Sequence, residues 1–326
     1  MRFAHNAVAE VWTKPSRIPK KYQSIATFLR DAAVAAAFVA LVLLAMFAYT
    51  GLWPPLVVVE SNSMMHSNEN HSNIGTIDTG DLVLVKKVNS LSDIETYMDS
   101  QISGHKTYGD YGDVVIYKRG GSDASTPIIH RALIYLEINS DGTSYRSESL
   151  RQAATEKWST SDPNDTWDRL TSSLTISNVG YNHLSVTIDI QSLGSSHRSG
   201  FITKGDHNLG TDQMYAAYGP VDLEWIVGKA RGEIPWFGLL KLWSTGSLGS
   251  PSPDNSVRDL WASLAIIVAT PMVIDITLTY REKREVSKKR IAEFLEKESA
   301  RSEKEKNAEA EAEGLDKTPD QPPTRP

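Results

Sequence analysis

At residues 128–136 the chain reads IIHRALIYL, an apolar run interrupted only by His130 and Arg131. The run is short and rich in β-branched and aromatic residues, which is typical of a buried strand rather than a helix. A strand holds its side chains on a rigid backbone. His130 is therefore either a core or edge histidine with satisfied hydrogen bonds, or an imidazole aimed at a partner.

Other segments on both sides of this run have the same character. Residues 82–85 (LVLV) and 114–117 (VVIY) are short apolar runs bounded by Gly or Asp, and alternate residues from Leu184 to Ile190 are apolar. Residues 137–198 are polar apart from Trp158, Trp167 and a few aliphatic positions. We expect a mainly β domain with an insertion at about 137–198 that forms its own small sheet.

Two apolar segments enclose this β-rich region. Residues 32–50 contain no charge and residues 260–278 contain only Asp275, so each can cross the ~30 Å hydrocarbon layer as a helix. A basic leader precedes the first segment, and residues 45–48 (AMFA) lack the small-x-small ending that favours cleavage. The sequence predicts two transmembrane helices, at 32–51 and 260–279, the first of them an uncleaved anchor.

Basic residues flank both predicted spans on the sides away from the β-rich region. Such residues are retained in the cytoplasm, so we expect a multi-pass protein of the cell membrane with a basic cytoplasmic N-terminus (1–31), an extracytoplasmic domain (52–259) and a cytoplasmic tail (280–326). The tail is dense in Glu, Lys, Arg and Ala, which predicts a charged helix that ends in disorder. The basic flanks are Arg2, Lys14, Arg17, Lys20, Lys21, Arg30 and then Arg281, Lys283, Arg284, Lys288, Lys289, Arg290.

Composition excludes several classes of function. Acidic residues outnumber basic ones by 25 to 16 in residues 51–259, so a nucleic-acid partner has no electrostatic basis. The chain has 0 cysteines, which removes disulfides, a thiol nucleophile and thiolate metal sites. The lipid bilayer is the partner that the composition favours.

A candidate nucleophile lies just beyond the first span, in residues 61–66 (SNSMMH). A serine hydroxyl needs a neighbouring base and a group that orients that base. His130 is one candidate base. Asp206 and Asp212 lie in residues 203–212 (TKGDHNLGTD), which alone would be read as a surface turn.

These segments, taken in order, resemble the signal peptidase I family, specifically its archaeal and endoplasmic-reticulum type, which uses His where the bacterial type uses Lys. The resemblance covers about residues 32–136 and 200–243, and each segment alone is weak. The matching segments are 61–66, 80–86 (GDLVLVK), 112–115 (GDVV), 129–131 (IHR), 204–208 (KGDHN) with Asp212, 226–230 (IVGKA) and 234–235 (IP).

The resemblance implies a signal-peptidase-like β fold and a serine endopeptidase that removes signal peptides from exported precursors after small residues. It implies Ser63 as nucleophile, His130 as general base, Asp212 as its acidic partner and Asp206 as a supporting residue. The Ser63 N–H and the Ser61 hydroxyl would form the oxyanion hole. No metal or organic cofactor is implied.

Further expectations concern partners. Signal peptides would bind as an extended strand, with the run from Leu56 to Val59 and the strand after Asp81 as candidate pocket walls. The enzyme would act close to the protein translocation channel. Residues 236–243 (WFGLLKLW) would either lie at the bilayer interface or pack in the core.

Two positions depart from the family pattern. His66 replaces the proline three residues after the nucleophile, and His207 replaces the second asparagine after Gly-Asp. His207 is an alternative base, whereas a Ser-Lys dyad would need Lys at position 130. The departures favour a rival hypothesis, a catalytically silent membrane-anchored binding or assembly protein. A second rival is a protease of the same fold that processes pilins or other surface proteins.

Overall fold

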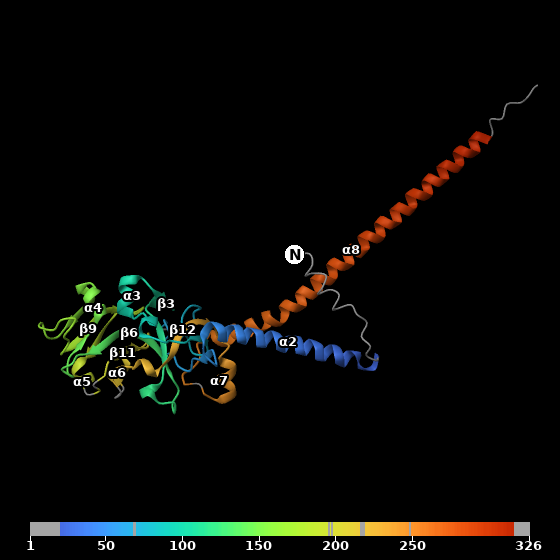
Figure 1. Ribbon diagram of the computed structural model, residues 1–326. Coiled ribbons are helices and arrows are strands. Elements are labelled where there is room, and N and C mark those ends of the chain that lie inside the picture. The colour runs from blue at the N-terminus through green and yellow to red at the C-terminus, as the bar shows by residue number, and fades with distance from the viewer. Residues whose placement is uncertain are drawn as a thin grey trace, which may run out of the picture. The chain divides into compact units, whose positions relative to one another are not determined.

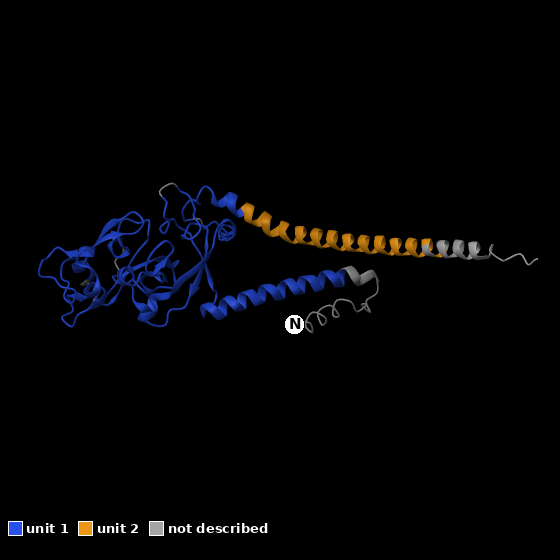
Figure 2. Ribbon diagram, turned by 90° about the horizontal axis from the view of Figure 1, so that it is seen from above, with its two compact units in different colours: residues 1–260 blue, residues 261–326 orange. Residues whose placement is uncertain are grey.

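The computed structural model of the chain describes residues 20–67, 70–194, 196, 198–215, 219–247 and 249–315. The chain divides into two units, residues 1–260 and 261–326 (Figure 2). Residues 1–19 of the predicted basic N-terminus lie outside the described residues, and so do residues 316–326, where the sequence predicts disorder.

The first unit is built on a 7-stranded antiparallel sheet (Figure 1), which agrees with the prediction of a mainly β domain. The predicted strands at 82–85, 114–117 and 128–136 are confirmed as β2, β5 and β6. The strand order is β1 (Leu56–Val58), β2 (Leu82–Lys86), β12 (Ile226–Ile234), β5 (Val114–Tyr117), β6 (Ile128–Ile138) and β11 (Gly200–Lys204), with β7 (Tyr145–Arg146) paired to β6.

The central strand β5 is buried on both faces. Val114 and Ile116 belong to one apolar cluster, whereas Val115 and Tyr117 belong to another. Because successive side chains of a strand point to opposite faces, a strand covered on both sides reads as a continuous apolar run. This double coverage explains why residues 114–117 show no alternation.

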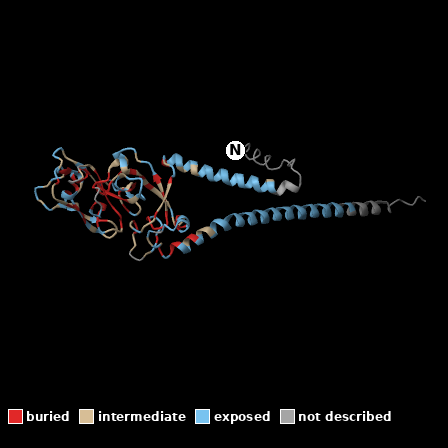
Figure 3. Cartoon of the chain, turned by 90° about the horizontal axis from the view of Figure 1, so that it is seen from below, coloured by how far each residue is buried: buried red, intermediate tan, exposed pale blue. Residues whose placement is uncertain are grey.

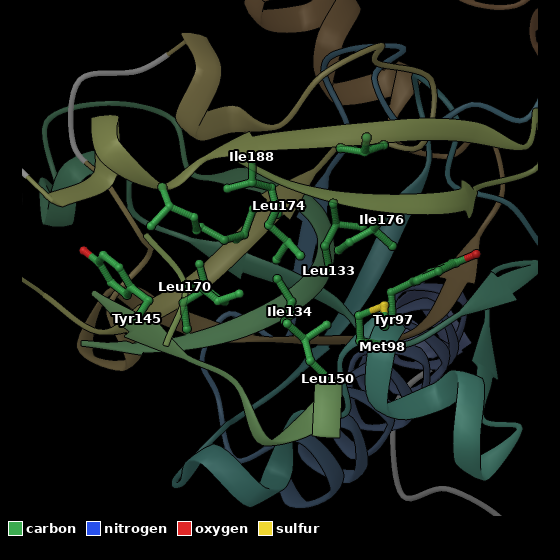
Figure 4. Close-up of a cluster of buried hydrophobic side chains, with 14 of the residues drawn as sticks. Tyr97, Met98, Leu133, Ile134, Tyr145, Leu150, Leu170, Leu174, Ile176 and Ile188 are labelled. Carbon is green, nitrogen blue, oxygen red and sulfur yellow. The ribbon is translucent and has the colours of Figure 1, made fainter. Parts of the chain in front are cut away.

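The insertion forms the predicted small sheet, which is 3-stranded in the order β10 (Leu184–Asp189), β9 (Ser173–Val179), β8 (Trp158–Thr160). It does not have a separate core. Leu133 and Ile134 of β6 share one buried cluster with Leu174 and Ile188 of the insertion (Figure 4), and Trp158 packs against that cluster. The insertion is therefore attached to the main sheet by apolar packing.

Short elements complete the first unit. A 2-stranded sheet is made by β3 (Lys106–Thr107) and β4 (Asp110–Tyr111). The short helices are α3 (Tyr97–Ser103), α4 (Glu148–Gln152), α5 (Ile190–Gly194), α6 (Asp212–Tyr215) and α7 (Leu239–Thr245), with 3-10 turns η1 (Leu91–Asp93), η2 (Arg119–Gly121), η3 (Thr155–Lys157) and η4 (Leu223–Trp225).

The segment 236–243 is divided between core and surface. Leu239 and Leu242 of α7 are fully buried, whereas Leu240 and Trp243 are 44% and 39% exposed. The indole N–H of Trp236 donates to Ser72 Oγ at 3.1 Å. One face of α7 therefore packs in the core, and the other remains available to a bilayer interface.

Two helices are long and apolar enough to cross a membrane, namely α2 (Lys20–Thr50) and α8 (Ser256–Leu315). Both are exposed over their apolar segments (Figure 3), and water is an unfavourable solvent for so much apolar surface. Helix α2 begins earlier than the predicted span at residue 32. Helix α8 continues beyond the predicted span, so the charged tail is helical to Leu315. Both helices support association with a lipid bilayer.

Candidate active site

The candidate nucleophile Ser63 lies in a turn that follows β1. Met64 and Met65, the next two residues, are 1% and 2% exposed, and the Met65 N–H donates to Asn62 O at 3.2 Å. The main-chain N–H of His207 donates to Ser63 O at 2.9 Å. We call residues 61–66 the nucleophile loop, which is anchored by two buried side chains and by a main-chain hydrogen bond.

His130 meets this loop from the sheet. In β6 it pairs with Val115 of β5, and it is 8% exposed. Its Nε2 atom lies 2.9 Å from Ser63 Oγ, within hydrogen-bonding distance. The strand thus directs the imidazole at Ser63. Of the two alternatives for His130, a core histidine or an imidazole aimed at a partner, the structure shows the second.

Asp212, the first residue of α6, lies on the other side of the imidazole. Its Oδ1 and Oδ2 atoms are 2.8 Å and 2.7 Å from His130 Nδ1. Tyr117 and Thr203 donate hydroxyl hydrogen bonds to Asp212 Oδ2 at 2.7 Å and 2.6 Å. A carboxylate only accepts hydrogen bonds, so His130 Nδ1 donates and Nε2 is left to accept the Ser63 proton.

The surroundings of Asp212 favour this ionised state. Burial raises the pKa of the Asp212 carboxyl, but the electrostatic attraction of His130 and the hydrogen bonds from His130, Thr203 and Tyr117 outweigh it, so its pKa lies below the ordinary value. The sequence did not single out Tyr117 or Thr203. Both stand in recognisable strands, but no local pattern indicates that their hydroxyls meet Asp212.

The side chain of Asp206 holds a buried ion pair with Arg131. Arg131 Nε and Nη2 donate to its two oxygens at 2.8 Å and 2.5 Å, and His66 Nε2 lies 2.7 Å from Oδ2. Burial raises the pKa of Asp206, but the charge of Arg131 is the main influence that lowers it well below its usual range. Asp206 therefore links Arg131 of β6 to His66 of the nucleophile loop.

Gly205 is sterically required beside these residues. A Cβ atom at this position would lie 2.6 Å from Ser63 O and 2.8 Å from His130 Nε2. The preceding Lys204 is 1% exposed, and its Nζ donates to the carbonyls of Gly205 and Asp206 at 2.9 Å and 3.2 Å. Lys204 thus fastens the turn around Gly205, and burial lowers the pKa of its ammonium group.

The two predicted oxyanion-hole residues are adjacent, with Ser61 Oγ 3.2 Å from Ser63 Oγ. Of the two histidines that depart from the family pattern, His66 bonds Asp206, and His207 Nδ1 lies 2.9 Å from the Tyr181 hydroxyl. The histidine ring that contacts the Ser63 hydroxyl is that of His130. The geometry therefore favours His130 over His207 as the base.

A cleft of about 490 Å³ borders these groups. Ser63, His130 and Asp212 line it together with the apolar side chains of Val58 and Ile129. The predicted pocket wall at Leu56–Val59 thus contributes Val58. Within the described ranges, no group of three or more His, Asp or Glu side chains could hold a metal ion. The arrangement can activate a hydroxyl for attack on a carbonyl beside a partly apolar cleft.

No family model matches this chain, and no curated protein matches it.

Proposed function

We propose that this protein is a membrane-anchored signal peptidase I, a serine endopeptidase that cleaves N-terminal signal peptides from exported precursors after small residues. The observation that carries the proposal is the continuous relay from Ser63 through His130 to Asp212, with its distances of 2.9 Å and 2.7 Å. Hydrogen-bonded groups of these three types are the ordinary means of activating a serine.

The proposed reaction begins with attack of Ser63 Oγ on the scissile carbonyl carbon. The serine proton passes to His130 Nε2, and the Asp212 carboxylate stabilises the imidazolium that results. The carbon–nitrogen bond then breaks, and the leaving amine takes the proton from His130. Water hydrolyses the acyl ester of Ser63 by the same route in reverse, with His130 as the base.

The developing oxyanion requires donors aimed at its position. The Ser61 hydroxyl and the Ser63 N–H are the proposed donors. Ser61 Oγ lies 3.2 Å from Ser63 Oγ. It is therefore close enough to reach the oxyanion, which is bonded to the same carbonyl carbon that Ser63 Oγ attacks. Such donors act strongly because they are oriented before the charge appears.

The cleft and the anchors support the choice of substrate. Val58, Ile128 and Ile129 give the cleft short apolar walls, which suit the small residues at the end of a signal peptide. Two helices of membrane-spanning length would keep this cleft near the bilayer, where signal peptides emerge. We place the domain on the extracytoplasmic side, close to the translocation channel, with both termini in the cytoplasm.

The rival hypothesis of a silent binding protein receives less support. A binding protein without catalytic activity would not require the hydrogen bonds from Tyr117 and Thr203 to Asp212. It would also not require a residue without a side chain at position 205. The departures at His66 and His207 leave the relay atoms in contact.

The test is cleavage of a precursor that carries an Ala-x-Ala site by the detergent-solubilised full chain. We expect Ser63→Ala and His130→Ala each to lose about 10⁴-fold or more in kcat. The matched control is Ser185→Ala, which alters an exposed serine in β10 and should cleave like the wild type.

Mass spectrometry of the cut bond separates the rivals. Cleavage by the wild type that survives Ser63→Ala would remove the nucleophile assignment, and absence of wild-type cleavage would favour the binding protein. Cuts confined to pilin-like precursors would favour the surface-protein protease.

A further inference from the structure

The turn between β9 and β10, residues 180–183, brings a side chain of the insertion to the candidate active site. The Tyr181 ring stacks on His66, with ring centroids 4.9 Å apart and planes 19° apart. Its hydroxyl is hydrogen-bonded to His207 Nδ1 at 2.9 Å. Tyr181 lies outside the two segments that resemble signal peptidase, yet it contacts one residue from each of them.

Both histidines belong to the immediate frame of the nucleophile. His66 ends the nucleophile loop, and its Nε2 atom bonds Asp206 at 2.7 Å. His207 donates its main-chain N–H to Ser63 O at 2.9 Å. A displacement of His207 would therefore reach Ser63 through one main-chain hydrogen bond, and a displacement of His66 would reach it along the nucleophile loop.

The turn that carries Tyr181 is itself firmly held. Gly180 has a φ of 80°, which a glycine adopts without strain, and the His183 N–H closes the turn on Gly180 O at 3.1 Å. The Tyr97 hydroxyl donates to Asn178 O at 2.8 Å. The turn is therefore a fixed support and not a loose flap.

The hairpin below the turn is mounted on the strand that carries the base. Leu174 and Ile188 of the hairpin pack in one buried cluster with Leu133 and Ile134 of β6 (Figure 4). The insertion and the strand that carries the base therefore share one core, and Tyr181 adds a polar contact between the insertion and the site.

We propose that Tyr181 is a positioning residue: stacked on His66 and hydrogen-bonded to His207, it holds the nucleophile loop so that Ser63 Oγ stays within reach of His130. The two histidines occupy the positions where this chain departs from the family pattern. The stack thus takes over the restraint that a proline at position 66 would supply through its fixed φ. The catalytic part of this inference rests on the proposed function.

The test compares Tyr181→Ala, Tyr181→Phe and the control Thr187→Ala in the detergent-solubilised full chain. Thr187 is exposed on the same hairpin, so its variant reports any general effect of altering the insertion. A small misplacement of a reacting atom costs up to ~10²-fold, so we expect Tyr181→Ala to lose about 10- to 100-fold in kcat with KM unchanged.

Tyr181→Phe keeps the ring on His66 and loses the bond to His207, so its loss of kcat should be smaller. Thr187→Ala should keep the wild-type kcat. Thermal unfolding midpoints above the assay temperature for all three variants exclude partial unfolding as the cause. Wild-type kcat in Tyr181→Ala would overturn the inference.

A second measurement does not depend on proteolysis. Amide hydrogen exchange, read by mass spectrometry on peptides that cover residues 61–66, should be faster in Tyr181→Ala and unchanged in Thr187→Ala. If the wild type cleaves no precursor, the proposed function fails while this exchange still decides whether Tyr181 holds the loop. Equal exchange in Tyr181→Ala and wild type would overturn the positioning role.

Discussion

Gly205 approaches His130 so closely that a Cβ atom at position 205 would lie 2.8 Å from His130 Nε2. The same atom would lie 2.6 Å from Ser63 O. One added methyl group would therefore clash with both the imidazole of the base and the main chain of the nucleophile. We expect Gly205→Ala to lower kcat by about 10²-fold while the chain remains folded. Gly232→Ala, where a Cβ meets its first neighbour at 3.9 Å, is the matched control, and equal activities of the two variants would contradict this steric role.

The Ser61 hydroxyl is expected to contribute to rate and not to substrate affinity. Removing one donor from an oxyanion hole typically costs ~10²–10³ in rate, so Ser61→Ala should lose kcat on that scale with KM unchanged. Ser61→Thr keeps a hydroxyl and should retain most activity. Steady-state kinetics on a precursor peptide would measure both, and full activity of Ser61→Ala would refute this assignment.

Tyr117 is expected to act on the rate through Asp212. Its hydroxyl donates to Asp212 Oδ2 at 2.7 Å and lies 3.1 Å from Thr203 Oγ1, and Tyr117→Phe removes this hydroxyl while keeping the ring. Hydrogen bonds to charged groups are worth about 1.5–3 kcal/mol, so kcat should fall about tenfold or more. Tyr135→Phe, in β6 but outside the relay, is the control. The prediction is wrong if both variants keep the same kcat.

Arg131 is expected to control stability. It is 1% exposed and donates to Asp206 and to the main-chain carbonyls of Tyr111 and Gly112. Removing one partner of a buried pair leaves an uncompensated charge, which costs about 3–5 kcal/mol. Arg131→Met should therefore lower the free energy of unfolding by that amount.

An exposed ion pair provides the comparison for Arg131. Arg146 and Glu137 are 49% and 48% exposed, and such pairs contribute about 0–1 kcal/mol. Chemical denaturation of Arg131→Met and Arg146→Met should show a clear difference between them. Similar losses of stability would show that Asp206 does not depend on Arg131.

Asp81 is expected to make stability depend on pH. Burial, opposed by hydrogen bonds from the Trp236 and Asp78 N–H groups, raises the pKa of Asp81 from 3.8 to about 7. The folded state therefore binds this proton more tightly than the unfolded state does. The stabilising effect is complete below pH 3.8 and is lost as pH rises to about 7.

Thermal unfolding at several pH values tests this effect with Asp81→Asn, which cannot ionise. The unfolding free energy of the variant minus that of the wild type should rise between pH 3.8 and about 7 and then level off. A constant difference across this window would exclude Asp81 as the titrating group.

Much of the fold was predictable because it depends on local patterns. The short β-branched runs at 114–117 and 128–136 favour buried strands, and the apolar segments at 32–50 and 260–278 are long enough to cross a bilayer. The boundaries of the long helices were not predictable, because charged residues such as Arg30 continue a helix as readily as they end a span.

The candidate site was predictable only as a set of residue types. The resemblance named Ser63, His130, Asp206 and Asp212, and the structure brings Ser63, His130 and Asp212 into one relay while Asp206 pairs with Arg131. Alternation along β6 predicts that His130 and Arg131 face opposite ways. It contains no information about which groups either of them meets.

By itself, the sequence determined a mainly β domain and two apolar helices. Both depend on local patterns, namely short β-branched or alternating runs for the strands and uninterrupted apolar segments of bilayer length for the helices. Only the tertiary structure decided which distant side chains meet: Ser63 with His130, Asp212 with Tyr117, and Tyr181 of the insertion with His66 and His207. These contacts depend on strand register and on how loops close, and a one-residue change of register would turn each strand's side chains to the opposite face.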